Sequence, residues 1–191
     1  MIKLAILGST RGTSLQSIID AINTGRLDAE IKIVVSDKKE AMILTRAQAY
    51  HLPHQWLDPM HQTRAIYDAQ LSDLLQQYGA QMIVLIGYMR ILSETFVKTW
   101  EGRIVNVHPS LLPLFAGKLN LAVHQAVLES NMKETGCTVH IVTNDVDGGP
   151  ILVQKKCLVL PHDTPETLKS RVQKLEGEAL VEALSWFVER Y

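Results

Sequence analysis

Short apolar runs alternate along this chain with longer segments in which apolar residues recur every three or four positions. Uninterrupted runs are typical of buried strands, and the longer period is typical of amphipathic helices. We predict strands at residues 2–7, 31–35, 54–57, 82–86, 104–108, 137–142 and 151–160. We predict helices at residues 15–22, 40–50, 62–78, 93–100 and 121–130, and from Pro165 nearly to Tyr191.

This alternation predicts an α/β fold, a doubly wound and mostly parallel sheet with helices on both faces. We expect residues 1–191 to form a single domain. In the helix at 62–78 the spacing predicts that the core side carries Ile66, Ala69, Leu71, Leu74 and Leu75.

The amino-acid composition limits which classes of binding partner we expect. The 19 Lys and Arg against 20 Asp and Glu leave no electrostatic footprint for nucleic acid or an anionic membrane. No apolar run approaches the length of a bilayer span, and the N-terminal run is better interpreted as a strand than as a signal peptide. Cys137 and Cys157 lack metal or redox spacing, which favours free thiols and a cytoplasmic location.

The stretch Arg103–Pro113, R-I-V-N-V-H-P-S-L-L-P, carries the first candidate chemistry. Asn106 and His108 are two apart, so on a strand both project from one face, and Pro109 ends the pairing. Two such donors can hold an oxyanion, and a histidine can move a proton near neutral pH. The alternative is an Asn that caps a turn beside a core histidine.

A glycine-rich loop, G-S-T-R-G-T-S at residues 8–14, stands between the first strand and the first helix. That order brings free backbone N–H groups and a helix N-terminus together, an arrangement that binds phosphate. It matches neither a Walker loop nor the dinucleotide fingerprint. The alternative is a tight turn with Thr13 or Ser14 as N-cap.

Two more loops follow predicted strands. The turn at residues 87–92, G-Y-M-R-I-L, could line the same crevice or simply connect a strand to a helix. In T-N-D-V-D-G-G-P, residues 143–150, a calcium loop is excluded because Thr143 and Gln154 would occupy the first and last ligand positions. The two glycines can instead present Asp145 or Asp147 to a cleft. An acidic surface turn is the alternative.

The motif N-V-H-P-S-L-L-P resembles the signature of the folate-dependent formyltransferases. The resemblance covers nearly the whole chain and is strongest to the glycinamide ribonucleotide formyltransferases. It implies a Rossmann-like formyltransferase fold and transfer of a formyl group to glycinamide ribonucleotide in purine biosynthesis. The donor would be 10-formyltetrahydrofolate, and no metal would be needed.

The resemblance also implies roles for individual residues. Gly12, Thr13 and Ser14 would hold the ribonucleotide phosphate, and Glu176 would contact the glycinamide. Contacts to the folate would come from Arg64, Met89, Arg90, Ile91, Leu92, Asn106 and Thr143. Asn106, His108 and Asp147 would carry the chemistry. Protonated His108 would stabilise the oxyanion, and Asp147 would raise the pKa of His108 and relay a proton through water.

The chain departs from the family pattern in three places. Ser14 stands where many members have Asn, and Ala116 where many have Pro. Residues 118–120 look inserted, and only the second histidine of a Leu-His-x-His segment remains, as His124. These differences concern the substrate loop rather than the reaction.

Other functions stay open at this point. Methionyl-tRNA formyltransferase and formyltetrahydrofolate hydrolase carry additional domains that this sequence lacks. An enzyme acting on an amino sugar nucleotide would share N-x-H-P without needing this phosphate loop. A non-catalytic nucleotide-binding module would keep residues 8–14 but would not need Asn106, His108 and Asp147 together. The sequence is compatible with a homodimer.

Overall fold

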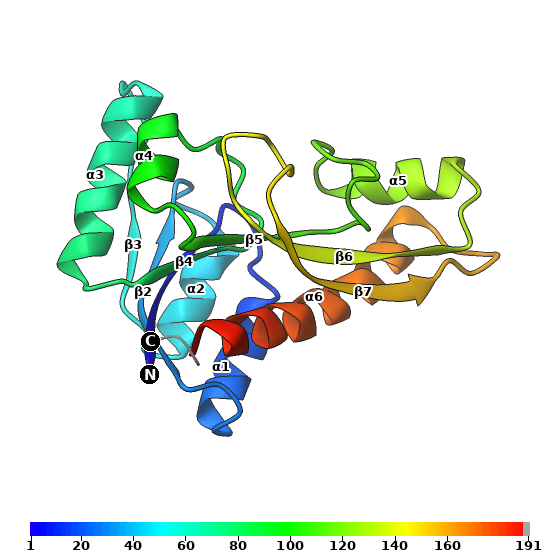
Figure 1. Ribbon diagram of the computed structural model, residues 1–191, viewed down its shortest axis with the longest axis horizontal. Coiled ribbons are helices and arrows are strands. Elements are labelled where there is room, and N and C mark those ends of the chain that lie inside the picture. Colours follow the sequence, from blue (N-terminus) through cyan, green and yellow to red (C-terminus); the bar gives the residue numbers. More distant parts are fainter. Residues whose placement is uncertain (189–191) are drawn as a thin grey trace.

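A computed structural model describes residues 1–188 and contains one seven-stranded sheet (Figure 1). The strands are β1 (Ile2–Leu7), β2 (Ala29–Ser36), β3 (His54–Trp56), β4 (Met82–Leu85), β5 (Ile104–His108), β6 (Glu134–Ile141) and β7 (Ile151–Leu158). Their order is β3-β2-β1-β4-β5-β6-β7. The strands β1 to β5 pair in parallel, whereas β6 and β7 are antiparallel to their neighbours. The α/β prediction with a mostly parallel sheet is therefore confirmed.

Six helices accompany the sheet in the described residues. They are α1 (Leu15–Asn23), α2 (Met42–Ala49), α3 (Arg64–Gln77), α4 (Glu94–Thr99), α5 (Leu121–Glu129) and α6 (Pro165–Val188). One core cluster joins residues of α1, α2 and α6 to one face of the sheet, and a second joins α3 and α4 to the other. The predicted last turn of α6, at residues 189–191, lies outside the described residues.

Alternation along β1 explains the two cores. Ile2, Leu4 and Ile6 belong to the cluster with α1 and α6, whereas Ala5 and Leu7 belong to the cluster with α3 and α4. Because both faces are covered, the strand is apolar almost throughout. None of the helices in residues 1–188 is long and apolar enough to cross a membrane.

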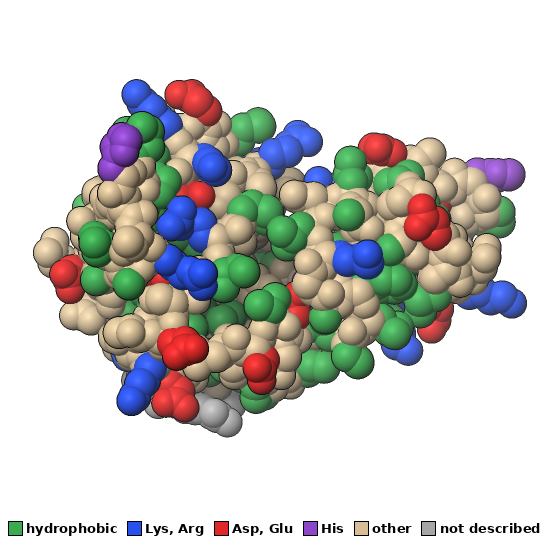
Figure 2. Space-filling model, turned by 90° about the horizontal axis from the view of Figure 1, so that it is seen from above, with side chains coloured by type: hydrophobic (Ala, Val, Ile, Leu, Met, Phe, Trp, Pro, Cys, Tyr) green, Lys and Arg blue, Asp and Glu red, His purple; other side chains and the backbone are tan. Residues whose placement is uncertain are grey.

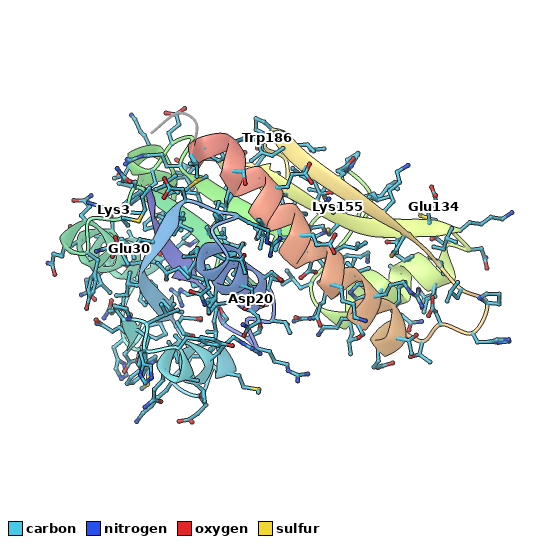
Figure 3. The ribbon with its side chains drawn as sticks, turned by 90° about the horizontal axis from the view of Figure 1, so that it is seen from below. Lys3, Asp20, Glu30, Glu134, Lys155 and Trp186 are labelled. Carbon is cyan, nitrogen blue, oxygen red and sulfur yellow. The ribbon has the colours of Figure 1, made fainter. Side chains whose placement is uncertain are left out.

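The long helix α6 crosses the face formed by β6 and β7 (Figure 3). Lys155 on β7 pairs with Glu182 on α6 at 2.7 Å. Because both side chains are partly exposed, the ion pair contributes little, and the apolar contacts of α6 hold it in place. This position brings Glu176 to the same end of the sheet as the loops after β1 and β5.

The helix α3 departs from the predicted core stripe. Ile66 is 53% exposed and Ala69 is also exposed, while Tyr67 and Asp68 are buried beside the predicted Leu71 and Leu75. Asp68 is tolerated inside because its carboxylate accepts the backbone N–H of Ser93 at 2.6 Å, at the start of α4. The prediction for Ile66 and Ala69 was wrong because a polar residue packs toward the core.

Several element boundaries also differ from the prediction. The strand β6 begins at Glu134, three residues before the predicted start, because it pairs with the whole of β7 from Leu158 back to Ile151. The helix α2 spans only Met42–Ala49. Ser93 caps α4 as expected, accepting the N–H of Phe96 at 3.3 Å.

Candidate active site

One cleft lies at the carboxyl ends of β1, β4 and β5, where the strand order changes direction between β1 and β4. Ligands of open α/β sheets bind at this kind of position. The cleft has a volume of about 280 Å³. Figure 2 shows it from above as a hollow bordered by hydrophobic side chains, with Lys and Arg side chains on the adjoining surface.

The loop after β1 forms one end of the cleft. Gly12 has a φ of +60°, and Leu15 donates its N–H back to the Gly12 carbonyl at 3.1 Å. In the described part of the chain, the backbone N–H groups of residues 10–14 donate to no protein acceptor. Free N–H groups before a helix provide donors for an anion.

Ser14 begins α1 without capping it through its side chain. Its hydroxyl turns toward α6 and donates to Glu176 Oε2 at 3.2 Å. Burial raises the pKa of the Glu176 carboxyl to about 7, although the Ser14 hydroxyl and the Lys169 charge lower it. Ser14 therefore occupies the expected N-cap position, but its side chain forms no capping hydrogen bond. The hydroxyl instead orients a carboxyl group that changes charge near neutral pH.

The side chains of Asn106 and His108 project from the same side of β5, as the spacing predicts. The antiparallel strand β6 places His140 directly opposite Asn106. Asn106 Nδ2 lies 3.2 Å from His140 Nε2, and His140 Nδ1 lies 3.0 Å from the Ile141 carbonyl. His140 Nε2 thus lies beside the Asn106 amide, while Nδ1 lies beside a carbonyl that can accept a ring N–H.

Asp147 joins both histidines. Its Oδ2 lies 3.2 Å from His108 Nδ1, its Oδ1 lies 3.5 Å from His140 Nε2, and Gly117 donates its N–H to Oδ2 at 2.8 Å. Burial would raise the pKa of Asp147, but His140, the Gly117 N–H and His108 outweigh it, so this pKa is lowered. The carboxylate is therefore charged at neutral pH.

His108 is 3% exposed, and its Nε2 faces the Phe115 carbonyl at 3.3 Å. Burial lowers the pKa of His108 below the ordinary 6.5. Asp147 and the Phe115 carbonyl raise this pKa by less, so the net direction is downward. The expected upward effect of Asp147 is present, but the expected raised pKa was wrong because desolvation of the imidazolium is larger.

The loop after β4 forms the other end of the cleft. Met89 donates its N–H to Ser9 Oγ at 2.9 Å, whereas the N–H groups of residues 90–92 donate to no acceptor in the described chain. The Arg90 guanidinium stacks over the Tyr67 ring, 4.3 Å from its centroid. Apolar side chains and free main-chain groups therefore occur together in this part of the cleft lining.

Among residues 1–188, no group of three or more His, Cys, Asp or Glu side chains is arranged to hold a metal ion.

Comparison with known proteins decides the family. The formyl transferase family model matches residues 2–184. The chain belongs to this family. It is 38% identical over 190 residues to a phosphoribosylglycinamide formyltransferase of Haemophilus influenzae, covering 99% of this chain and 88% of that protein. An Escherichia coli protein of the same name is 37% identical over 187 residues, covering 97% and 87%.

Solved structures of formyl transferases share the fold. A glycinamide ribonucleotide transformylase from Symbiobacterium toebii superposes with a TM-score of 0.94 at 39% identity, over 99% of this chain and 88% of that one. A phosphoribosylglycinamide formyltransferase from Coxiella burnetii in complex with CHES gives 0.92 at 40% identity, over 98% and 87%. The chain is accordingly an enzyme of the transferase class.

The formyl transferase cleft gathers nearly all residues that the sequence singled out. Its lining includes Gly12, Thr13, Ser14, Met89, Arg90, Ile91, Leu92, Asn106, His108, Thr143, Asp147 and Glu176. Arg64 is not among the lining residues and is exposed at the start of α3, so its folate contact stays a prediction. Asp145 lines the cleft as well.

Sequence reasoning missed His140. It lies on the predicted strand at residues 137–142, is 2% exposed and lies between Asn106 and Asp147. The signal was present in the alternation of residues 137–142, which puts Thr138 and His140 on one face. The antiparallel register that brings this face beside β5 was not predicted. Lys169 and Gln173, about two turns and one turn before Glu176 on α6, also line the cleft and were missed.

Proposed function

We propose that this enzyme transfers the formyl group of 10-formyltetrahydrofolate to the amine of glycinamide ribonucleotide in purine biosynthesis. The observation that carries the proposal is the convergence of Asn106, His108 and Asp147 between a loop of free N–H groups and a loop of apolar side chains. The relatives named above support the same substrates.

The ribonucleotide phosphate would bind the N–H groups of residues 10–14, and the glycinamide would lie beside Glu176. The pterin would use the main-chain groups of residues 90–92, with Leu85, Ile91 and Val142 as apolar walls. These assignments put the two substrates on neighbouring strands, so the amine can approach the formyl carbon over Asn106 and His108.

The side chains suit an acyl-transfer reaction. Attack of the amine on the formyl carbon forms an oxyanion, which the Asn106 amide would stabilise by a hydrogen bond and the His108 imidazolium by its positive charge. Both ring nitrogens of His108 face oxygen acceptors, an arrangement that only the protonated ring satisfies completely. The Asp147 carboxylate holds that charge and would pass a proton from the amine toward the leaving folate nitrogen.

The remaining assignments belong to the same proposal. The seven strands form one sheet, which supports one catalytic domain over residues 1–191. The thiols of Cys137 and Cys157 are free, which supports a reducing, cytoplasmic location. The proposal includes two small-molecule substrates and no resident metal.

The test is a formyl-transfer assay with 10-formyltetrahydrofolate and glycinamide ribonucleotide. We expect rapid formation of tetrahydrofolate and the formylated ribonucleotide. The unphosphorylated glycinamide riboside serves as the matched substrate and should react poorly. Equal rates with both amines, or a preference for a nucleotide-linked amino sugar, would contradict the proposal.

Folate binding predicts a local signature in the loop after β4. Adding a folate analogue should shift the backbone amide resonances of Arg90 and Leu92, because their N–H groups are free and face the cleft. The amide of Gly102, in a turn remote from the cleft, is the reference signal. Unmoved signals at Arg90 and Leu92 under saturating analogue would place the folate elsewhere.

Glu176 predicts how ribonucleotide binding depends on pH. Its raised pKa of about 7 means that the carboxyl is protonated below this pH and charged above it. Because the charged form attracts the amine of the substrate, KM for the ribonucleotide should fall as the pH rises through about 7. Glu176→Gln should remove this titration while KM for the folate stays unchanged. A titration that persists in the Gln variant would assign it to another group.

A further inference from the structure

Ser9 joins the loop after β1 to the loop after β4, and residues of both loops line the cleft. It follows β1, and its hydroxyl donates to Asp37 Oδ1 at 2.5 Å while accepting the N–H of Met89 at 2.9 Å. Its own N–H donates to the Gly87 carbonyl at 3.1 Å. Ser9 is not among the residues that line the cleft, so it does not touch a ligand there.

Asp37 fixes the direction of the hydroxyl. It follows β2, is 4% exposed, and takes the single hydrogen that Ser9 can donate. The hydroxyl lone pairs are therefore available to the Met89 N–H. One buried carboxylate thus determines how Ser9, in the loop after β1, holds Met89, in the loop after β4.

The two loops also touch with little free space. Gly87 has a φ of +59°, and a Cβ at this position would lie 2.5 Å from Thr10 Oγ1. The loop after β1 and the loop after β4 are therefore in close contact at this point. The contact is made through Ser9, Thr10 and Gly87 rather than through a ligand.

We infer that Ser9 is a positioning residue that couples the ribonucleotide and folate subsites. The inference rests on the proposed function. The N–H groups of residues 10–14 have no protein acceptor, so a bound phosphate would give them fixed acceptors and hold the loop in one conformation. The hydrogen bond between Ser9 and Met89 then fixes the position of Met89, and with it the N–H groups of residues 90–92 that would bind the pterin. Each substrate consequently tightens the binding of the other.

The coupling is measured with a folate analogue whose formyl group cannot be transferred. Its Kd is determined by calorimetry with and without saturating glycinamide ribonucleotide, and the ribonucleotide is titrated with and without the analogue. In the wild-type chain we expect each ligand to lower the Kd of the other by about fivefold or more. In Ser9→Ala the ratio should fall to about one in both directions. A wild-type ratio of one, or an unchanged ratio in Ser9→Ala, would overturn the inference.

Three further variants separate coupling from general stability. Ser130→Ala removes a hydroxyl that donates to the Val127 carbonyl at the end of α5, away from the cleft, and should keep the wild-type ratio. Asp37→Asn retains an oxygen acceptor for the Ser9 hydroxyl and should also keep the wild-type ratio of affinities. Asp37→Ala removes the acceptor of the Ser9 hydroxyl and should lower the ratio of affinities. This variant tests the contact between Ser9 and Met89 even if Ser9→Ala folds poorly.

The outcomes distinguish this inference from the proposed function. A wild-type chain that binds neither ligand contradicts the proposed function. A wild-type chain that binds both ligands with independent affinities contradicts only the coupling. Loss of coupling in Ser130→Ala, at unchanged melting temperature, would also overturn the role of Ser9.

Discussion

Replacing Gly12 with valine is expected to weaken ribonucleotide binding about 100-fold, about 2.7 kcal/mol, by removing phosphate hydrogen bonds. Gly12 has a φ of +60°, which a β-branched residue rarely adopts. A Cβ there would also lie 2.7 Å from Ile43 Cβ and Cδ1, so the loop must shift away from α2. The misplaced N–H groups of residues 10–14 then no longer surround the phosphate. Calorimetric titration with the ribonucleotide measures the loss.

Gly25→Val is the matched control for Gly12→Val. Gly25 has a φ of +71°, but a Cβ at this position meets nothing within 4 Å. It therefore carries a comparable backbone cost without displacing the loop after β1. We expect Gly25→Val to lower the melting temperature and to leave ribonucleotide affinity intact. Folate affinity in Gly12→Val should fall much less than ribonucleotide affinity. Equal loss of both affinities in a folded protein would count against the phosphate assignment.

The parts of the site that depend on local sequence could be predicted before the structure. The two-residue spacing of Asn106 and His108 fixes their common side on any strand, and Pro109 fixes where that strand ends. The order of strand, glycine-rich loop and helix likewise predicts free N–H groups at residues 10–14. Each of these conclusions needs only the geometry of one element and its immediate neighbours.

The parts that depend on distant pairing could not be predicted. His140 reaches the site because β6 is antiparallel to β5 and puts residue 140 opposite residue 106. Alternation predicts which residues of a strand share a face but not which strand lies beside it. Asp68 of α3 is buried because Ser93, 25 residues later, supplies its hydrogen bond. Helical periodicity alone assigned that core position to Ile66 and Ala69.

The pKa of His108 depends both on a contact that could be predicted and on burial that could not. The family resemblance implies that Asp147 lies near His108 and raises its pKa, and the structure contains that contact at 3.2 Å. The net direction is downward because the imidazole is buried under the loop that carries Phe115. Burial is a property of the whole fold, so the sign of the sum required the structure.

Asp147→Asn is expected to lower kcat by two to three powers of ten, roughly 2–4 kcal/mol, while ribonucleotide binding stays nearly normal. The carboxylate lies 3.2 Å from His108 Nδ1 and 3.5 Å from His140 Nε2, so it is the anion that offsets the burial of the imidazolium. Without it, desolvation is less opposed and the pKa of His108 falls further. The protonated ring is then scarcer at neutral pH, so the residual rate should rise as the pH is lowered. Single-turnover rates across pH measure this, with NMR titration of His108.

Asp145→Asn is the matched control, since it removes the same charge from the same loop. Asp145 lines the cleft but is exposed, and among the described residues its carboxylate forms no ion pair with a histidine. It should therefore slow turnover far less and leave the titration of His108 in place. If Asp145→Asn is the slow enzyme and Asp147→Asn turns over normally, the catalytic carboxylate has been misassigned. If neither variant is slow, the charge on His108 is not needed in the transition state, and the roles proposed for Asn106, His108 and Asp147 fail together.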